Sequence, residues 1–79
     1  MSVKEEVLAV LKEVKPAKDL ENTKDIIEGG YIDSFELLSL ISALSDHFGI
    51  EIGIDEIIPQ NFNSVEDMIS MVERLQKRG

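Results

Sequence analysis

The first hydrophobic positions of the chain are spaced as they would be along one face of a helix. Apolar side chains recur every three or four residues between Ser2 and Pro16, and charged residues fill the positions between them. Ser2 and Glu5 have the spacing of a capping box, in which each side chain accepts a hydrogen bond from the other residue's backbone amide. Because proline cannot continue a helix, Pro16 ends this one. We predict an amphipathic helix with one buried stripe: Val3, Val7, Leu8, Leu11 and Val14.

A long polar connection follows over residues 15–32. Connections of this length in a small helical protein tend to carry function or to cover the core. We expect the aliphatic residues Leu20, Ile26 and Ile27 to hold the loop against the core. Gly29 and Gly30 provide backbone freedom directly before the next element.

The central helix has the strongest local signals in the chain. Asp33 and Glu36 form a second capping box, and Ile32 and Leu37 are placed as a hydrophobic staple across it. Gly49 is typical of the residue that ends a helix. The apolar face is wider than a surface stripe, which predicts a central position in the fold. Its members are Phe35, Leu37, Leu38, Leu40, Ile41, Leu44 and Phe48.

Beyond Gly49, three isoleucines alternate with other residues at positions 50, 52 and 54. A single strand would lack a partner, so we interpret this segment as an extended loop that buries its isoleucines. Residues 55–58, directly before Pro59, predict one short helical turn. Ser64, with Asp67 three positions later, marks the start of the last helix, whose stripe is Val65, Met68, Ile69, Val72 and Leu75.

These elements predict the fold class. We expect an all-α, small four-helix bundle: three main helices, one short helix and a long loop between the first two. At 79 residues the chain is expected to form one domain over residues 1–79, with modest stability because a chain of this size buries a small fraction of its surface.

Charge is unevenly distributed along the chain. Sixteen acids and eight bases give a formal charge of −8, and residues 25–73 contain eleven carboxylates and no Lys or Arg. This excess of negative charge argues against binding to nucleic acid and against anionic membranes. The middle of the chain either meets a positively charged partner or keeps the protein in solution, and charge alone favours the two readings equally.

Composition narrows the chemistry further. Without cysteine the chain has no disulfide, no thiolate zinc site and no thiol nucleophile. The N-terminus lacks the apolar region of a secretory signal, and no apolar run has membrane-spanning length, so we expect a cytoplasmic protein that does not insert into membranes.

Catalysis by this chain is not expected. Ser34 and His47 are the only nucleophile and base worth pairing, and thirteen residues along one helix separate them by roughly 20 Å. His47 is better explained as a cation near the end of a helix. The adjacent acids 55–56 and 66–67 are typical of helix starts, and no metal-binding spacing is present.

Ser34 can have a different role, because it is the first residue inside a firmly capped helix. A phosphate ester on its hydroxyl would meet the positive end of the helix dipole and unpaired amide groups. On position alone, an ordinary first-turn serine beside Asp33 is the better reading.

The residues around Ser34 change that balance. The stretch Gly-Tyr-Ile-Asp-Ser-Phe-Glu-Leu at positions 30–37 resembles the attachment motif of acyl and peptidyl carrier proteins, in which Asp-Ser and a large apolar residue begin the second helix. The order of elements, the length and the acidity extend the resemblance over essentially the whole chain. The resemblance implies that Ser34 is the attachment point of 4′-phosphopantetheine, with Asp33 as its motif partner. A phosphopantetheinyl transferase would move this group from coenzyme A, with magnesium. The reactive thiol would then come from the attached phosphopantetheine and not from a cysteine of the chain.

The details of the motif suggest which carrier this is. Housekeeping fatty-acid carriers typically read Leu-Gly-Ala-Asp-Ser-Leu-Asp, whereas the Tyr-Ile-Asp-Ser form is similar to D-alanyl carriers and to free-standing carriers of peptide or polyketide pathways. The polar face of the helix is rich in serine rather than acid. By the resemblance, the partners are the transferase, an acyl- or aminoacyl-activating ligase and downstream acyl-transfer enzymes, which meet a monomer. The residues predicted to dock these partners are Phe35, Glu36, Asp46, Asp55 and Glu56.

Two alternatives accompany this reading. Leu38, Ile41 and Leu44 are interpreted as core residues rather than as a groove for an acyl chain. The rival function is an unmodified acidic helical module that binds a basic protein.

Overall fold

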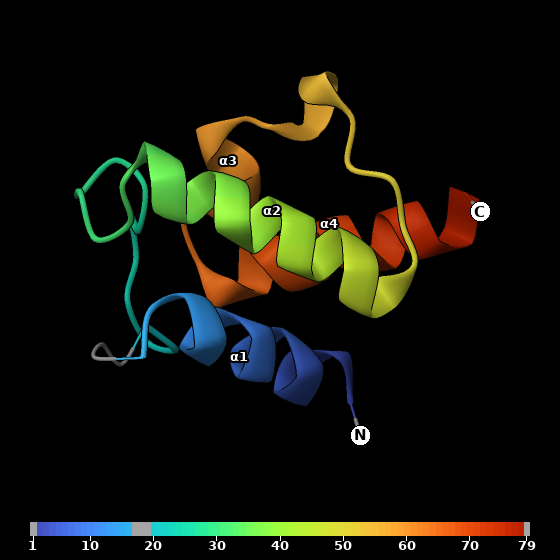
Figure 1. Cartoon of the computed structure of the whole chain (residues 1–79), viewed down its shortest axis with the longest axis horizontal. Helices are drawn as coiled ribbons and strands as arrows, with labels where there is room; N and C mark the ends of the chain where they lie inside the picture. Colours follow the sequence, from blue (N-terminus) through green and yellow to red (C-terminus); the bar gives the residue numbers. More distant parts are fainter. Residues whose placement is uncertain (1, 17–19, 79) are drawn as a thin grey trace.

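The computed structural model describes residues 2–16 and 20–78 (Figure 1). Within these residues the chain is helical and contains no strand, which confirms the predicted all-α fold class. None of the described helices is both long enough and apolar enough to cross a membrane. The elements are α1 (Val3–Val14), α2 (Ser34–Phe48), a 3-10 turn η1 (Ile54–Glu56), α3 (Pro59–Phe62) and α4 (Val65–Arg78).

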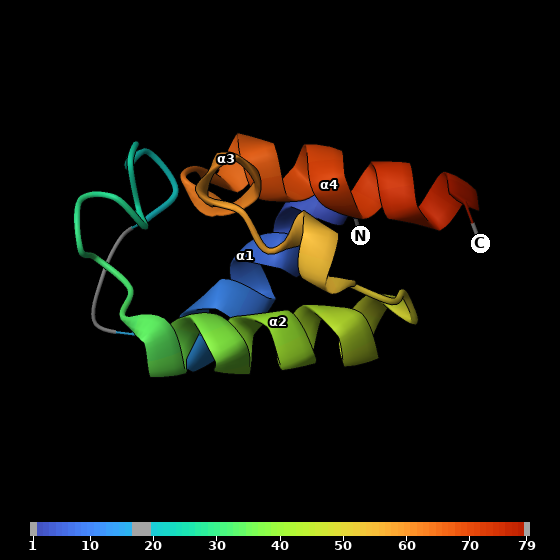
Figure 2. The same ribbon diagram turned by 90° about the horizontal axis from the view of Figure 1, so that it is seen from above.

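The helices are arranged around α1. Figure 2 shows α2 and α4 as two rods that run in the same direction, with α1 between them running the opposite way. α1 contacts both α2 and α4, and α3 packs against α4. The short turn η1 lies on the opposite side of the molecule from α1 (Figure 1).

Local capping signals define the ends of α1. The Glu5 amide donates to Ser2 Oγ over 3.1 Å, and the Ser2 amide donates to Glu5 Oε1 over 3.3 Å, which confirms the capping box. The helix ends at Val14 because Lys15 precedes a proline, and that position disfavours helical geometry.

The core is formed by buried aliphatic and aromatic side chains from every helix and from the loop. The prediction that Leu20, Ile26 and Ile27 hold the loop against the core is confirmed, with Ile27 partly buried, and Ile32 joins them. Residues 17–19 of that loop lie outside the described part of the chain. The buried residues are Val7, Val10, Leu11, Leu20, Ile26, Ile32, Leu40, Leu44, Phe62, Val65, Met68, Met71, Val72 and Leu75.

The predicted wide apolar face of α2 is wrong on one side. Leu40 and Leu44 are fully buried and Ile41 is half-buried, but Leu38 is 59 % exposed and Phe35 is 82 % exposed. Residues two apart on a helix lie about 200° apart around its axis, so Leu38 faces solvent when Leu40 faces the core. The interpretation of Leu38 as a core residue is therefore incorrect.

The segment between α2 and α4 is partly as predicted. Gly49 adopts a left-handed φ of 63°, and residues 50–53 form neither helix nor strand, with Ile50 and Ile52 packed against the core. Ile54, however, is 89 % exposed, so the third isoleucine is not buried as expected. A helical turn forms at η1, and Pro59 then begins α3 at the first helical position, where its missing N–H costs nothing.

Candidate functional site

Ser34 is the first residue of α2, and its side chain is exposed. The capping box around it is confirmed: the Glu36 amide donates to Asp33 Oδ1 over 2.8 Å, and the Asp33 amide donates to Glu36 Oε1 over 3.0 Å. The Leu37 amide donates to the Asp33 carbonyl over 2.9 Å. Among the described contacts of the first turn, the amide groups of Ser34 and Phe35 are left without a partner, as the first donors of a helix are.

A tight turn over residues 25–31 leads the chain into this helix. Gly29 is required there, because a Cβ atom on it would lie 2.6 Å from the Asp25 carbonyl oxygen, which accepts a hydrogen bond from the Gly29 amide itself. Gly30 has a φ of 77°, which glycine adopts at no steric cost. The predicted need for backbone freedom before α2 is thus confirmed at Gly30, whereas Gly29 is required because a side chain would have no room there.

The fold brings a base to the start of α2, although the surrounding sequence has none. Lys15, just beyond α1, places its Nζ 2.8 Å from Glu36 Oε2. The hydrogen bond from Lys15 lowers the pKa of Glu36 below its usual range, and the Asp33 amide lowers that pKa further. Both oxygens of Glu36 therefore have partners within the chain, and a docking enzyme would meet an ion pair rather than a lone carboxylate.

The pair of Lys15 and Glu36 makes the free energy of unfolding depend on pH in the acidic range. Because the folded-state pKa of Glu36 lies below its unfolded value, the contribution of Glu36 is present at neutral pH and is lost as the pH falls through that lowered pKa. Urea unfolding of wild type and of Glu36→Gln between neutral pH and about pH 3 should show the smaller pH dependence in the variant. Equal slopes in the two proteins would contradict this assignment.

Three exposed apolar residues lie within four positions of the serine along the chain. Tyr31 is 42 % exposed, Phe35 follows Ser34 directly, and Leu38 lies one helical turn beyond it. A shallow depression next to Phe35 is lined by Glu13, Val14, Phe35, Glu36 and Ser39. An exposed hydroxyl at a helix start, with exposed apolar residues close by in the chain, is accessible to a large partner.

Comparison with known proteins matches residues 2–72 to the family described as phosphopantetheine attachment site. The chain belongs to this family. The cofactor predicted from the sequence, 4′-phosphopantetheine, is the group for which this family of carrier proteins is named. The helical fold is consistent with that of small carrier proteins, and the resemblance found in the sequence is confirmed.

The relatives include carriers of two kinds. The chain is 32 % identical over 78 residues to a D-alanyl carrier protein of Bacillus velezensis, covering 96 % of this chain and all of that protein. A D-alanyl carrier protein of Bacillus licheniformis matches with the same identity and coverage. A probable acyl carrier protein, PigG, of a Serratia species is 32 % identical over 57 residues, which are 72 % of this chain and 66 % of that protein.

The other predicted site residues of this carrier protein do not gather at Ser34. Asp46 is exposed in the last turn of α2, about 18 Å along the helix from Ser34, and Asp55 is exposed on η1. His47 Nε2 lies 3.0 Å from Glu6 Oε1 of α1, at the opposite end of α2 from the serine. The expected separation of Ser34 from His47 is therefore confirmed.

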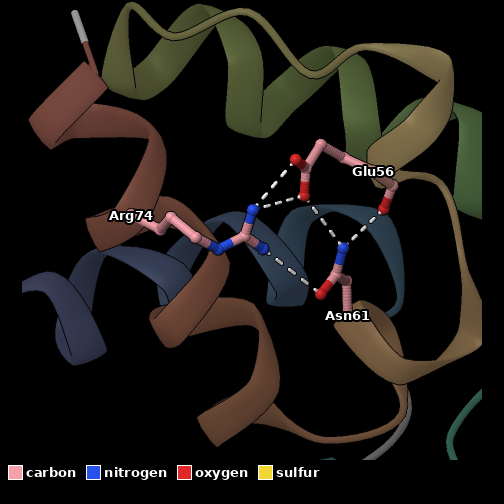
Figure 3. Close-up of polar contacts among 3 residues, drawn as sticks. All are labelled: Glu56, Asn61 and Arg74. Carbon is pink, nitrogen blue, oxygen red and sulfur yellow. Dashed lines mark hydrogen bonds and ion pairs between the residues drawn. The ribbon is translucent and has the colours of Figure 1, made fainter.

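Glu56 has a structural position that the sequence did not indicate. Its side chain is buried, and Arg74 Nη1 donates to both of its oxygens over 2.8 and 2.9 Å. Asn61 Nδ2 donates to the Glu56 carbonyl over 2.7 Å and to its side chain over 3.2 Å (Figure 3). This cluster fastens η1 to α3 and α4. Glu56 is not presented on the surface, so we exclude it from the docking residues.

Loss of Arg74 should leave this carboxylate buried without its cation. We expect Arg74→Met to lower the free energy of unfolding by about 1 to 3 kcal/mol, and Glu56→Gln in the same chain to recover part of that loss. Lys77→Met, which removes an exposed base from the same helix, should change stability by less than about 0.5 kcal/mol. Urea unfolding measures all four proteins, and equal losses for the two methionine variants would refute the role of the cluster.

Sequence reasoning missed three residues that position other parts of the chain through distant contacts. Lys15, Arg74 and Asn63 each act on a partner at least eighteen positions away, and no local pattern marks such pairs. The only available signal was that Lys15 and Arg74 flank the acid-rich residues 25–73. That signal does not indicate which acid each base will contact.

Proposed function

We propose that this protein is a discrete carrier that is modified with 4′-phosphopantetheine on Ser34 and shuttles acyl or aminoacyl groups between partner enzymes. The observation that carries the proposal is the exposed Ser34 hydroxyl at the capped start of α2, within the region matched to the carrier family. Fatty-acid, polyketide, non-ribosomal peptide and D-alanylation pathways use such carriers. The two full-length D-alanyl carrier relatives support an aminoacyl cargo, handled in the cytoplasm.

The residues around Ser34 fit a phosphodiester. The amides of Ser34 and Phe35 and the positive end of the α2 dipole favour a negative group there. When bound, phosphopantetheine supplies the thiol that carries acyl groups as thioesters. The chain itself contributes position: the Asp33 carboxylate accepts the Glu36 amide, so it acts as a helix cap that fixes the start of α2.

Modification requires a base from the enzyme. The Ser34 oxygen forms a bond to the phosphorus that bears pantetheine in coenzyme A, while the bond from that phosphorus to the second phosphate breaks and the nucleotide leaves. The hydroxyl proton passes to a base on the transferase. Among the described residues, the only histidine is at the far end of α2, which agrees with this division of roles.

The test is the intact mass of the full chain after incubation with coenzyme A, magnesium and a broad-specificity phosphopantetheinyl transferase. We expect a gain of one phosphopantetheine per chain, located by peptide mapping at residue 34. An unchanged mass, under conditions that modify a known carrier, would reject the proposal and would favour an unmodified acidic interaction module.

The docking surface proposed for the transferase, the ligase and the acyl-transfer enzymes combines apolar and acidic groups. Phe35 and Ile54 are the most exposed large apolar side chains described, Asp46 and Asp55 supply negative charge, and Glu36 is presented as an ion pair with Lys15. Because α2 has serine rather than acid along its middle, apolar contact should contribute more than charge to affinity.

We expect Phe35→Ala to lower kcat/KM for modification about tenfold, mainly through KM, since an exposed aromatic anchor is worth about 1 to 2 kcal/mol at an interface. Its stability to urea should equal that of wild type. Raising the salt concentration should slow the wild type only modestly. A strong salt dependence with no effect of Phe35→Ala would reverse this ranking of apolar and charged contacts.

A further inference from the structure

Asn63 lies between α3 and α4, yet its contacts are with the loop that precedes Ser34. Its side-chain oxygen accepts hydrogen bonds from the amides of Ile27 and Glu28 over 3.1 and 3.2 Å. Its side-chain nitrogen donates to Glu28 Oε1 over 2.6 Å, and its carbonyl accepts the Ile26 amide over 2.8 Å. One residue therefore makes four hydrogen bonds to a turn more than thirty positions away.

These bonds complete the hydrogen bonding of the turn. The amides of residues 29, 30 and 31 donate to carbonyls within the turn itself, those of residues 25, 27 and 26 respectively. The amides of residues 26, 27 and 28 donate to Asn63. Six consecutive amides thus have partners, and half of them depend on a single residue of another element. Without the Asn63 side chain, the amides of Ile27 and Glu28 would have to find water, while the Ile26 amide would keep its bond to the backbone carbonyl of residue 63.

Asn63 is itself held in place by its neighbours. Phe62 before it and Val65 after Ser64 are both 1 % exposed, and the Ser64 hydroxyl accepts the Asp67 amide at the start of α4. Ile26, whose amide donates to Asn63, is fully buried. The contact therefore joins two segments that are each anchored in the core. It restrains the position of the chain between Ile26 and Ser34.

We propose that Asn63 is a positioning residue for the attachment of phosphopantetheine: it fixes the turn over residues 26–31 and, through that turn, the place at which Ser34 is presented. This inference rests on the proposed modification of Ser34. Asn63 touches neither Ser34 nor the incoming group. Its loss should lower kcat, the rate of transfer within the bound complex, more than it raises KM, because Asn63 is not one of the residues proposed for docking.

A reversed hydrogen bond tests the contact specifically. Asn63→Asp keeps the oxygen that accepts the two amides but places a second carboxylate against Glu28. Adding Glu28→Gln to Asn63→Asp supplies an amide donor, so the bond forms in the opposite direction. Asn22→Asp, an identical chemical change at an exposed position of the same loop, controls for added charge. Asn63→Ala removes the side-chain bonds altogether.

We expect Asn63→Asp and Asn63→Ala to lower kcat/KM for modification by the transferase about tenfold, chiefly through kcat. The combined Asn63→Asp, Glu28→Gln variant should return to within about threefold of wild type, and Asn22→Asp should match wild type. Unchanged kinetics in Asn63→Asp, or absence of rescue in the double variant, would overturn the proposal. All variants are assayed under conditions where urea unfolding shows them to be folded.

Amide hydrogen exchange separates this proposal from the proposed function. The amides of Ile27 and Glu28 should exchange faster in Asn63→Ala than in wild type, while those of α2 keep their protection. Unchanged exchange at both amides would overturn the positioning role even if Ser34 is modified normally. A wild-type chain that the transferase does not modify would instead reject the attachment itself, and exchange would still decide whether Asn63 holds the turn.

Discussion

Replacement of Ser34 by alanine is expected to abolish modification completely while leaving the fold intact. The Ser34 side chain is exposed, and the capping bonds at this end of α2 belong to Asp33 and Glu36. Removing one exposed hydroxyl should therefore change the free energy of unfolding by less than about 0.5 kcal/mol. Intact mass after incubation with coenzyme A and the transferase should stay at the unmodified value.

Other serines of the same helix provide matched controls. Ser39 and Ser42 are also exposed on α2, but they lie beyond its first turn, where the amides are occupied within the helix. Ser39→Ala and Ser42→Ala should gain the same mass as wild type. A mass gain in Ser34→Ala would place the attachment at another residue. Absence of the mass gain in both control variants would also contradict attachment at Ser34.

The largest effect on stability is expected from Leu44→Ala. Leu44 is fully buried in the core, and truncation of such a leucine costs about 2 to 5 kcal/mol through lost burial and the cavity left behind. Small proteins have only about 0.05 to 0.15 kcal/mol of stability per residue, so this loss is comparable with the whole. Urea unfolding followed by far-ultraviolet circular dichroism should show a partly or fully unfolded variant.

Leu38→Ala is the matched comparison, because the same residue type on the same helix is 59 % exposed. We expect its stability to stay within about 0.5 kcal/mol of wild type. Comparable losses for the two variants would mean that α2 buries both of its apolar sides, which would contradict the orientation described above.

Features encoded by neighbouring residues could be predicted from the sequence. The two capping boxes, Gly49 at the end of α2 and the Ser64 cap of α4 depend on side chains within a few positions of one another. The family resemblance likewise rests on a contiguous motif around Ser34. Interactions of this range determine where each main helix begins or ends, and the predicted helices agree with the structure for that reason.

Features that depend on distant partners could not be predicted. Whether Leu38 or Ile54 is buried depends on which side of its segment is covered by the rest of the chain. The hydrophobicity of the residue alone does not indicate which side that is. Glu56 reads as an ordinary helix-start acid until Arg74 is seen beside it. The four bonds of Asn63 join it to residues 26–28, more than thirty positions away, and no local pattern marks such a contact.

Two contacts between an acid and a base join α1 to α2 with opposite polarity, and the one with His47 is an ion pair when that histidine is protonated. Near the start of α1 an acid, Glu6, meets His47 at the end of α2, whereas beyond the end of α1 a base, Lys15, meets Glu36 at the start of α2. If α1 lay against α2 in the reverse direction, Glu6 would face Glu36 and Lys15 would face protonated His47. Such like-charge encounters are unfavourable. The pairs therefore favour the observed orientation of α1 over the reverse one, in which like charges would meet.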